Sequence, residues 1–412
     1  MRTLLADPAQ LATWLRDRDP VSESARDRLE AARELGEQAH VLPNPQLQAA
    51  VGGFVIGSTN PASPQLPLAQ TTNYQVGVAE LVELGKRGPR QSAADLRARE
   101  AGESAIGALG ARLGDATTAL AHLAYVVSKR DVVAANLQAA KQLRDLEKTR
   151  LDKQDLSALE FARIELETEA LELQLGRAEA EVTSALAVCS AAIYAPCSAA
   201  GLDPSALDSA APLPPALPPS DQAIEHRPAR EATRLEAQAL GWDATLARNR
   251  RIPDVTLGAA YLLDNLTIAG NQHQQLIFSA AIPLPFFDRG EHDAAAARAN
   301  ARAIEAEDRA TIAEAHGVVE GLLAQRQTLQ ATLHRLETES VPKSAQIILQ
   351  TRVSFDRGQT RLADLLLVER AHRDLLLEVL DTRFDLFTVR AQLRQALGLD
   401  DEVARAAGGK QR

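Results

Sequence analysis

The chain has 412 residues, of which 45% are hydrophobic, 24% are charged and only 3% are aromatic, a composition that favours long helices over a globule with an aromatic core. Acidic residues outnumber basic ones by 55 to 45, and only seven of the basic residues are lysines. The resulting net charge of −10 argues against a nucleic-acid binder, which needs a basic face.

The N-terminal residues MRTLLADPAQ contain no continuous apolar segment, so they do not have the pattern of a secretory signal peptide. No stretch reaches about 18 uncharged apolar residues, the length that a membrane-spanning helix requires. Two cysteines are too few for a four-cysteine zinc site or a disulfide framework.

The chain contains an internal duplication of about 200 residues. The tetrapeptide RLEA occurs at residues 28–31 and again at 234–237, and residues 76–88 align with residues 278–290. Prolines concentrate between the two copies, where they prevent a continuous helix and favour an extended connector. We therefore predict a first repeat over 1–200, a Pro-rich linker over 201–220, a second repeat over 221–400 and a flexible tail over 401–412.

Each repeat begins with a short amphipathic helix and continues into two runs with the two-residue period of β-strands. These runs predict β-hairpins over about 45–85 and 253–287, closed by polar loops at 57–72 and 264–274. One face of the strands is apolar: Leu47, Val51, Val55, Tyr74, Val76, Val78, Val82 and Leu84 in the first repeat, and Val255, Leu257, Ala259, Tyr261, Leu263, Leu276, Phe278, Ala280, Ile282 and Leu284 in the second. Four strands of roughly ten residues have the length of tilted membrane-crossing strands.

A long helical hairpin ends each repeat, over about 91–195 and 291–397. The first outgoing helix would be on the order of 80 Å long at 1.5 Å per residue. Ser157 and Glu160 form a capping-box signature at the start of its return helix, and Pro342 predicts a kink in the second hairpin.

An open four-stranded sheet is not stable in lipid, because each unpaired edge amide costs several kcal/mol there. Three copies of the chain would supply twelve strands, an even number in the range of outer-membrane barrels, and twelve long helical strands around a hollow cylinder. The alternative is a non-membrane coiled-coil scaffold or interaction protein, in which the strands form a soluble sheet.

Two segments, IPDVTLGAAY at 252–261 and IPLPFFDRGEHDAAAARA at 282–299, resemble the TolC-like outer-membrane efflux proteins, in particular their cobalt-zinc-cadmium (CzcC-like) branch. The resemblance implies a mixed, mainly α fold. Long antiparallel helical hairpins would form a trimeric α-barrel tunnel in the periplasm, and four strands per chain would contribute to a 12-stranded outer-membrane β-barrel. Belt residues near the strands would be the aromatic side chains of Phe54, Tyr74, Tyr261 and Phe278.

The function that this resemblance implies is a passive exit duct of a tripartite efflux system. Its partners would be two further copies, a periplasmic adaptor, an inner-membrane proton-driven pump of the resistance-nodulation-division type, and outer-membrane lipid. Heavy-metal cations would be the substrates, and the chain itself would need no cofactor. No nucleophile elbow, P-loop, dinucleotide fingerprint or CxxC motif argues for an enzyme.

The resemblance also predicts a gate at the second helical tip, where an acidic residue after the turn lines the closed aperture. Asp364 has the matching place, six residues after the turn glycine Gly358, and the equivalent point of the first repeat falls near Ala158. Arg357 and Arg361 can latch the gate by pairing with Asp364, or contact the adaptor instead. The alternative role of Asp364 is to start a helix, whose dipole favours a carboxylate there.

Histidine spacing predicts no metal site, since the eight histidines form no HxxxH or HExxH pattern. The polar cluster of Asp288, Glu291, His292 and Asp293 sits at a helix start and favours capping over metal binding.

Cys189 and Cys197 flank Pro196 near the end of the first hairpin. They form a small disulfide if the proline turn brings their Cα atoms within about 7 Å, and are otherwise two inert buried residues.

Overall fold

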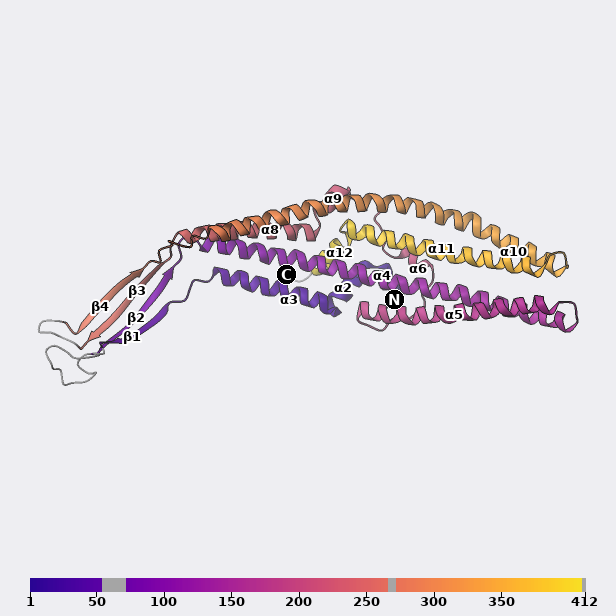
Figure 1. Cartoon of the computed structure of the whole chain (residues 1–412), viewed down its shortest axis with the longest axis horizontal. Coiled ribbons are helices and arrows are strands. Elements are labelled where there is room, and N and C mark those ends of the chain that lie inside the picture. The colour runs from indigo at the N-terminus through magenta and orange to yellow at the C-terminus, as the bar shows by residue number, and fades with distance from the viewer. Residues whose placement is uncertain (54–71, 266–271, 410–412) are drawn as a thin grey trace. The chain divides into compact units, whose positions relative to one another are not determined.

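The computed structural model describes residues 1–53, 72–265 and 272–409 (Figure 1). Phe54, Val55 and most of both predicted hairpin loops lie outside these residues. Within them, no helix combines the length and the apolarity that a membrane span needs.

The two repeats share one underlying order, which is short helices, then two strands, then a long helical hairpin. The first contains α1 (Arg2–Ala6), α2 (Pro8–Arg18), α3 (Pro20–His40), β1 (Gln46–Gly52), β2 (Asn73–Val82), α4 (Arg87–Asp152) and α5 (Ala158–Ile193). The linker contains α6 (Ser205–Ser209). The second repeat contains α7 (Ser220–Glu225), α8 (Pro228–Arg248), η1 (Asn249–Arg251), β3 (Val255–Asp264), β4 (Gln274–Ala281), α9 (Glu291–Arg335), η2 (Leu336–Ser340), α10 (Val341–Asp356), α11 (Leu362–Ala396) and α12 (Leu399–Gly408). This order confirms a mainly helical chain with two long helical hairpins and four strands.

The chain forms two compact units, and each unit is built from both repeats. Unit 1 comprises residues 1–28, 102–231 and 308–412, and unit 2 comprises residues 29–101 and 232–307. The predicted repeats are therefore repeats of the sequence and not separate folded units. Each compact unit is held together by contacts between residues of the two repeats.

Unit 2 contains one antiparallel sheet with the strand order β1-β2-β3-β4 (Figure 1). The register places Val76 opposite Tyr261, and Tyr261 opposite Leu276. Because side chains alternate between the faces of a strand, these residues share one face with the other predicted apolar residues of the described strands. The opposite face is mostly polar or small, but it also carries Leu81, Leu262 and Ile277. Its polar and glycine residues are Gln46, Gln48, Asn73, Gln75, Gly77, Thr256, Gly258, Asp264, Gln275 and Ser279.

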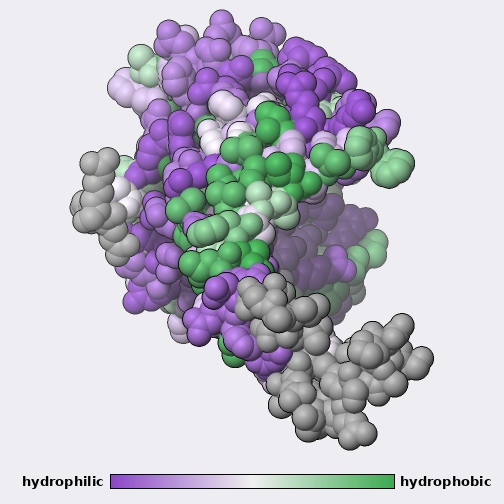
Figure 2. Space-filling model, turned by 90° about the vertical axis from the view of Figure 1, so that its left-hand side faces the viewer, coloured by the Kyte–Doolittle hydropathy of each residue, from purple (hydrophilic) through white to green (hydrophobic). Residues whose placement is uncertain are grey.

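None of the described residues covers the apolar face of the sheet. Leu47, Val76 and Phe278 are all exposed on it, and the last is 80% accessible. Hydrophobic side chains form a continuous green area in the view of Figure 2. The sheet thus has one face that is apolar apart from Glu80 and Gln274, and an opposite face that is mostly polar or small, largely as the two-residue period predicts.

The core of unit 1 gathers the helical hairpins and the linker. Leu120 of α4, Ile193 of α5 and Phe387 of α11 are fully buried in one hydrophobic cluster. Ala206 and Leu207 of α6 are buried in the same cluster. The linker was predicted as an extended connector, but these apolar side chains gain free energy by packing, and five of its residues form a helix.

Two further details differ from the sequence predictions. Residues 401–408 belong to α12 rather than to a flexible tail, because Ala404 is buried in the core and Arg394 pairs with Asp400 at 2.7 Å. At the predicted kink, the chain passes through the π-helix η2, and Pro342 lies in the first turn of α10, where its missing amide is tolerated.

Candidate gate at the helical tips

The second tip is a tight turn between α10 and α11. Its hydrogen bonds run from the Gly358 amide to the Phe355 carbonyl at 2.8 Å and from the Gln359 amide to the Ser354 carbonyl at 2.9 Å. Gly358 has a φ of +71°, a left-handed conformation that glycine adopts without a steric cost. The left-handed conformation explains why a glycine suits this position between the two helices.

The first tip has the same hydrogen bonds with a different residue at the turn. The Gln154 amide donates to the Leu151 carbonyl at 2.9 Å, and the Asp155 amide to the Arg150 carbonyl at 2.9 Å. Gln154 has a φ of +61°, so it takes the place of Gly358. The residue six positions later is Glu160, which corrects the sequence expectation that the counterpart of Asp364 lies near Ala158.

Glu160 and Asp364 occupy the same position of their helices but have different neighbours. The Glu160 carboxylate accepts from the Ser157 hydroxyl at 2.8 Å and from the Ser157 amide at 3.2 Å, which confirms the predicted capping box. These hydrogen bonds hold the pKa of Glu160 below its usual range. At the second tip the N-cap residue is Arg361, whose side chain has donors only and does not cap α11.

Asp364 is consequently an exposed carboxylate in the first turn of α11. In the described part of the chain, its side chain has neither a hydrogen bond nor an ion pair. Arg357 and Arg361 are also exposed, and neither pairs with Asp364. The structure brings these three residues to one tip without forming the predicted latch.

The two tips pack against each other through residues that sequence reasoning missed. Phe355 and Leu365 of the second hairpin share a hydrophobic cluster with Leu143 and Ile164 of the first. The guanidinium of Arg150 lies 5.3 Å from the centre of the Phe355 ring. This cluster fixes the position of the turn that carries Gly358.

Further from the tips than this apolar contact, an ion-pair cluster joins the two hairpins. Glu167 of α5 pairs with Arg373 of α11 at 3.1 Å and also with Arg370. Burial would raise the pKa of Glu167, but hydrogen bonds from both arginines outweigh it and hold that pKa below its usual range. Two arginines spaced three apart on one helix face were the only sequence signal for this cluster.

A cavity of about 240 Å³ lies beside these charges, among α4, α5, α10 and α11. His372 lines it, and its Nδ1 is 2.7 Å from the Ser344 hydroxyl. Burial lowers the pKa of His372, so this histidine is neutral at pH 7. No group of three or more histidine, cysteine or acidic side chains in the described ranges can hold a metal ion.

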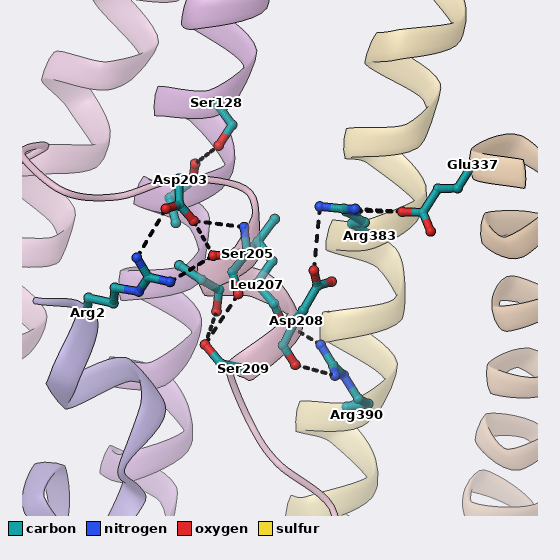
Figure 3. Close-up of polar contacts among 12 residues, drawn as sticks. Arg2, Ser128, Asp203, Ser205, Leu207, Asp208, Ser209, Glu337, Arg383 and Arg390 are labelled. Atoms are coloured by element: carbon teal, nitrogen blue, oxygen red, sulfur yellow. Dashed lines mark hydrogen bonds and ion pairs between the residues drawn. The ribbon is translucent and has the colours of Figure 1, made fainter. Parts of the chain in front are cut away.

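The linker is fastened to the second hairpin by arginines of α11 (Figure 3). Arg383 bridges Asp208 of the linker at 3.5 Å and Glu337 of η2 at 2.6 Å. Arg390 donates to the Leu207 carbonyl at 2.6 Å and to the Asp208 carbonyl at 3.0 Å. The π-helix and the linker are therefore held by the same helix.

Cys189 and Cys197 are joined by a disulfide, with their Cα atoms 6.0 Å apart. Cys189 is completely buried beside Ile193. The Cys197 amide donates to the Ser190 hydroxyl at 3.0 Å, which holds the turn around Pro196.

In the polar cluster at the start of α9, Asp288 and Asp293 contact nearby groups of the same unit. The Asp288 carboxylate accepts from the Gly290 amide at 2.8 Å, and Asp293 pairs with Arg250. These contacts are a local turn and an ion pair, and helix capping by this cluster stays a prediction.

The chain combines paired helical hairpins with a four-stranded sheet in a duplicated sequence. Residues 220–399 match the family model described as outer membrane efflux protein. The match supports the TolC-like family that the sequence motifs indicate. No curated protein sequence matches the chain.

Three solved structures share the fold over nearly the whole chain. CusC, from a study of its folding and transmembrane channel formation, has a TM-score of 0.80 at 15% identity and covers 95% of this chain and 91% of its own. VceC from Vibrio cholerae has a TM-score of 0.75 at 20% identity, with coverages of 95% and 96%. The Campylobacter jejuni CmeC outer membrane channel has a TM-score of 0.75 at 14% identity, with coverages of 95% and 86%.

Proposed function

We propose that the chain is the outer-membrane channel component of a tripartite efflux system. It acts as a passive exit duct for substrates that an inner-membrane pump and a periplasmic adaptor deliver. The duct consumes no nucleotide and binds no cofactor. The family match and the shared fold support this role.

The two-faced sheet is the observation that carries the proposal. Its apolar face suits lipid and its polar face suits a water-filled lumen. Strands β1 and β4 are the edges of the sheet, so each has one side without a strand partner among the described residues. Three copies that pair β4 of one chain with β1 of the next close a barrel of twelve strands.

An exposed leucine stripe on α5 supports contact with a second copy. Leu159, Leu166 and Leu173 are seven residues apart and each is 67–68% accessible. They lie on the face of α5 opposite Ile164 and Leu171, which are buried in the chain. A seven-residue apolar repeat is the pattern of a helix that packs against a partner helix.

The matching surface of the partner is α10, where Leu349 and Val353 are exposed. The two helices would pair in opposite directions, and Lys343 of α10 would approach the acidic flank of the α5 stripe at Glu165 and Glu169. Such contacts supply the seam between protomers of the proposed homotrimer.

The Asp364 carboxylates of three copies would form one acidic ring at the periplasmic mouth. Because no hydrogen bond or ion pair occupies Asp364 in the described chain, its charge is available to the lumen. A ring of like charge attracts cations and repels anions. Arg357 and Arg361 stay candidates for a latch in another state of the tip or for contact with the adaptor.

Heavy-metal cations are the proposed substrates, and a resistance-nodulation-division pump is the proposed energy source. The support is the resemblance of segments 252–261 and 282–299 to the cobalt-zinc-cadmium branch. A wide water-filled duct selects weakly, so the pump would determine which cation is exported.

The test combines native mass measurement of the detergent-extracted protein with single-channel recording in planar bilayers. A trimer that forms conducting pores supports the proposal. A water-soluble monomer without conductance would overturn it and favour the coiled-coil scaffold instead.

A further inference from the structure

A basic pocket lies at the base of the sheet in unit 2. Its volume is about 540 Å³, and it is lined by Arg248, Arg251, Ile252, Pro285, Arg289 and Glu291. Three guanidinium groups and one carboxylate give this pocket, the Arg248 pocket, a local charge of +2 in a chain whose net charge is −10. The pocket therefore has the opposite sign from the chain as a whole.

Arginines of the pocket are not neutralised by the protein. In the described residues, Arg248 and Arg251 have no hydrogen bond or ion pair, and Arg289 donates only to the Pro285 carbonyl at 3.4 Å. The neighbouring Arg250, by contrast, pairs with Asp293 outside the pocket lining.

The corresponding junction of the first repeat has no such surplus. Lys86 pairs with Asp254 at 2.7 Å, and Arg90 pairs with Glu83. Arg87, the residue that aligns with Arg289 in the duplication, donates to the His40 carbonyl at 3.2 Å. Two of the three basic residues at the first junction thus pair with a carboxylate, whereas none of the three arginines of the Arg248 pocket does so among the described residues.

The pocket adjoins an exposed apolar segment. Phe287 is fully exposed, Phe286 is 69% accessible, and Leu284 and Ile282 before them are also exposed. These residues follow the apolar face of β4 directly in the sequence, with Pro285 shared between the segment and the pocket. Two adjacent phenylalanines without any cover mark a surface that contacts an apolar partner.

We propose that the Arg248 pocket binds the phosphate of an anionic phospholipid, while Phe286 and Phe287 contact its acyl chains. Guanidinium groups bind phosphate in a bidentate manner, and apolar side chains such as phenylalanine enter the boundary between headgroups and acyl chains. The surplus of two positive charges selects a lipid with net negative charge over a zwitterionic one. The proposal rests on the proposed function, which puts the sheet in a membrane.

The experiment measures phospholipid retained by the full chain in detergent, by native mass spectrometry after exposure to phosphatidylglycerol or phosphatidylcholine. Wild-type protein is expected to retain phosphatidylglycerol preferentially. Replacing Arg248, Arg251 and Arg289 together by Gln should lower this retention roughly tenfold or more and abolish the preference. The control variant Arg298→Gln/Arg302→Gln removes two exposed charges of α9 and should retain the lipid like the wild type.

A second variant separates the apolar contribution from the charge. Phe287→Ser changes a side chain that supports no packing, so the fold is preserved. It should reduce retention of both lipids while the preference for phosphatidylglycerol stays.

Equal phosphatidylglycerol retention by wild type and by the triple arginine variant would overturn the proposal. So would binding of inorganic phosphate without retention of either lipid, which would identify a free-anion site. Conductance recorded on the same preparations tests the proposed duct separately. Protein that conducts but shows no preference for phosphatidylglycerol would contradict lipid binding by the Arg248 pocket and leave the duct proposal intact.

Discussion

Asp364 and Glu160 show how one neighbouring residue decides what a carboxylate does. Both are the third residue of a helix that follows the same tip turn. Ser157 binds Glu160 in a capping box, whereas Arg361 offers no acceptor and leaves Asp364 exposed. The family resemblance indicated Asp364 by its position after Gly358. Its counterpart in the first repeat was misplaced, because a glutamine in a left-handed conformation cannot be recognised from the sequence.

Asp364→Asn should weaken block of the channel by divalent cations about tenfold and lower its cation preference. Three carboxylates about 8 Å from a cation each attract it by about 1 kcal/mol in water, and salt screens part of this attraction. Current recordings at several concentrations of a divalent cation measure the change. Glu160→Gln is the control, since its carboxylate is engaged in the cap, and unchanged block in Asp364→Asn would remove this residue from the pore.

Glu167→Gln should destabilise the contact between the hairpins by about 2 kcal/mol, because two arginines lose their half-buried counter-charge. The pKa of Glu167 is lowered in the folded state, so its contribution is complete above the ordinary value of 4.5 and is lost as pH falls through the folded pKa. The difference in thermal unfolding midpoint between wild type and variant should therefore shrink at acidic pH. Glu179→Gln, which changes an exposed carboxylate of the same helix, should leave the midpoint near that of the wild type.

Secondary-structure elements were predictable where a local pattern determines them. The alternation of apolar residues around Tyr261 predicted both the strand and its face, and Ser157 with Glu160 predicted the start of α5. The linker helix was missed because its prolines dominate the local pattern, whereas the burial of Leu207 depends on α4 and α11. The π-helix η2 was missed as well, since only a kink follows from Pro342.

The disulfide closes a short loop at the end of α5. In the chain-entropy account, a loop of this size contributes about 2.5 kcal/mol. Cys189→Ser should therefore lower the thermal unfolding midpoint by several degrees, and reduction of the wild type should have the same effect. Thiol labelling of the unreduced protein checks the bond, and full modification of both Cys189 and Cys197 would contradict it.

The duplication predicts the order of elements along the chain but not how the two repeats pack together. Similar segments near Gly88 and Gly290 predicted two equivalent halves, yet each compact unit draws on both halves. Contacts such as Glu167 with Arg373 join residues about 200 positions apart, and no local pattern specifies such pairs. The resemblance implies the proposed trimer, and the exposed leucines of α5 are a surface that such a trimer would bury.

Leu166→Asp should shift the protein from trimer to monomer. The substitution places a charge in the middle of the proposed apolar seam between protomers, where its desolvation is unfavourable. Native mass measurement in detergent gives the proportion of each species. Gln174→Asp adds the same charge to an exposed position beside the stripe and should leave the trimer intact. Persistence of the trimer in both variants would remove α5 from the seam.

Each chain has two helical tips with the same turn, and these tips determine the symmetry of the mouth of the proposed trimer, where a partner would bind. Six turns of one backbone design would surround the opening, three with glycine and three with glutamine. The backbone of the mouth would approximate a sixfold ring. Its charge would alternate around the ring, because the turn with Gly358 precedes the uncapped carboxylate of Asp364, whereas the turn with Gln154 precedes Glu160, which is engaged in a cap. A six-membered adaptor would accordingly meet two kinds of binding position in alternation, and its neighbouring subunits would make unequal contacts although their sequences are identical.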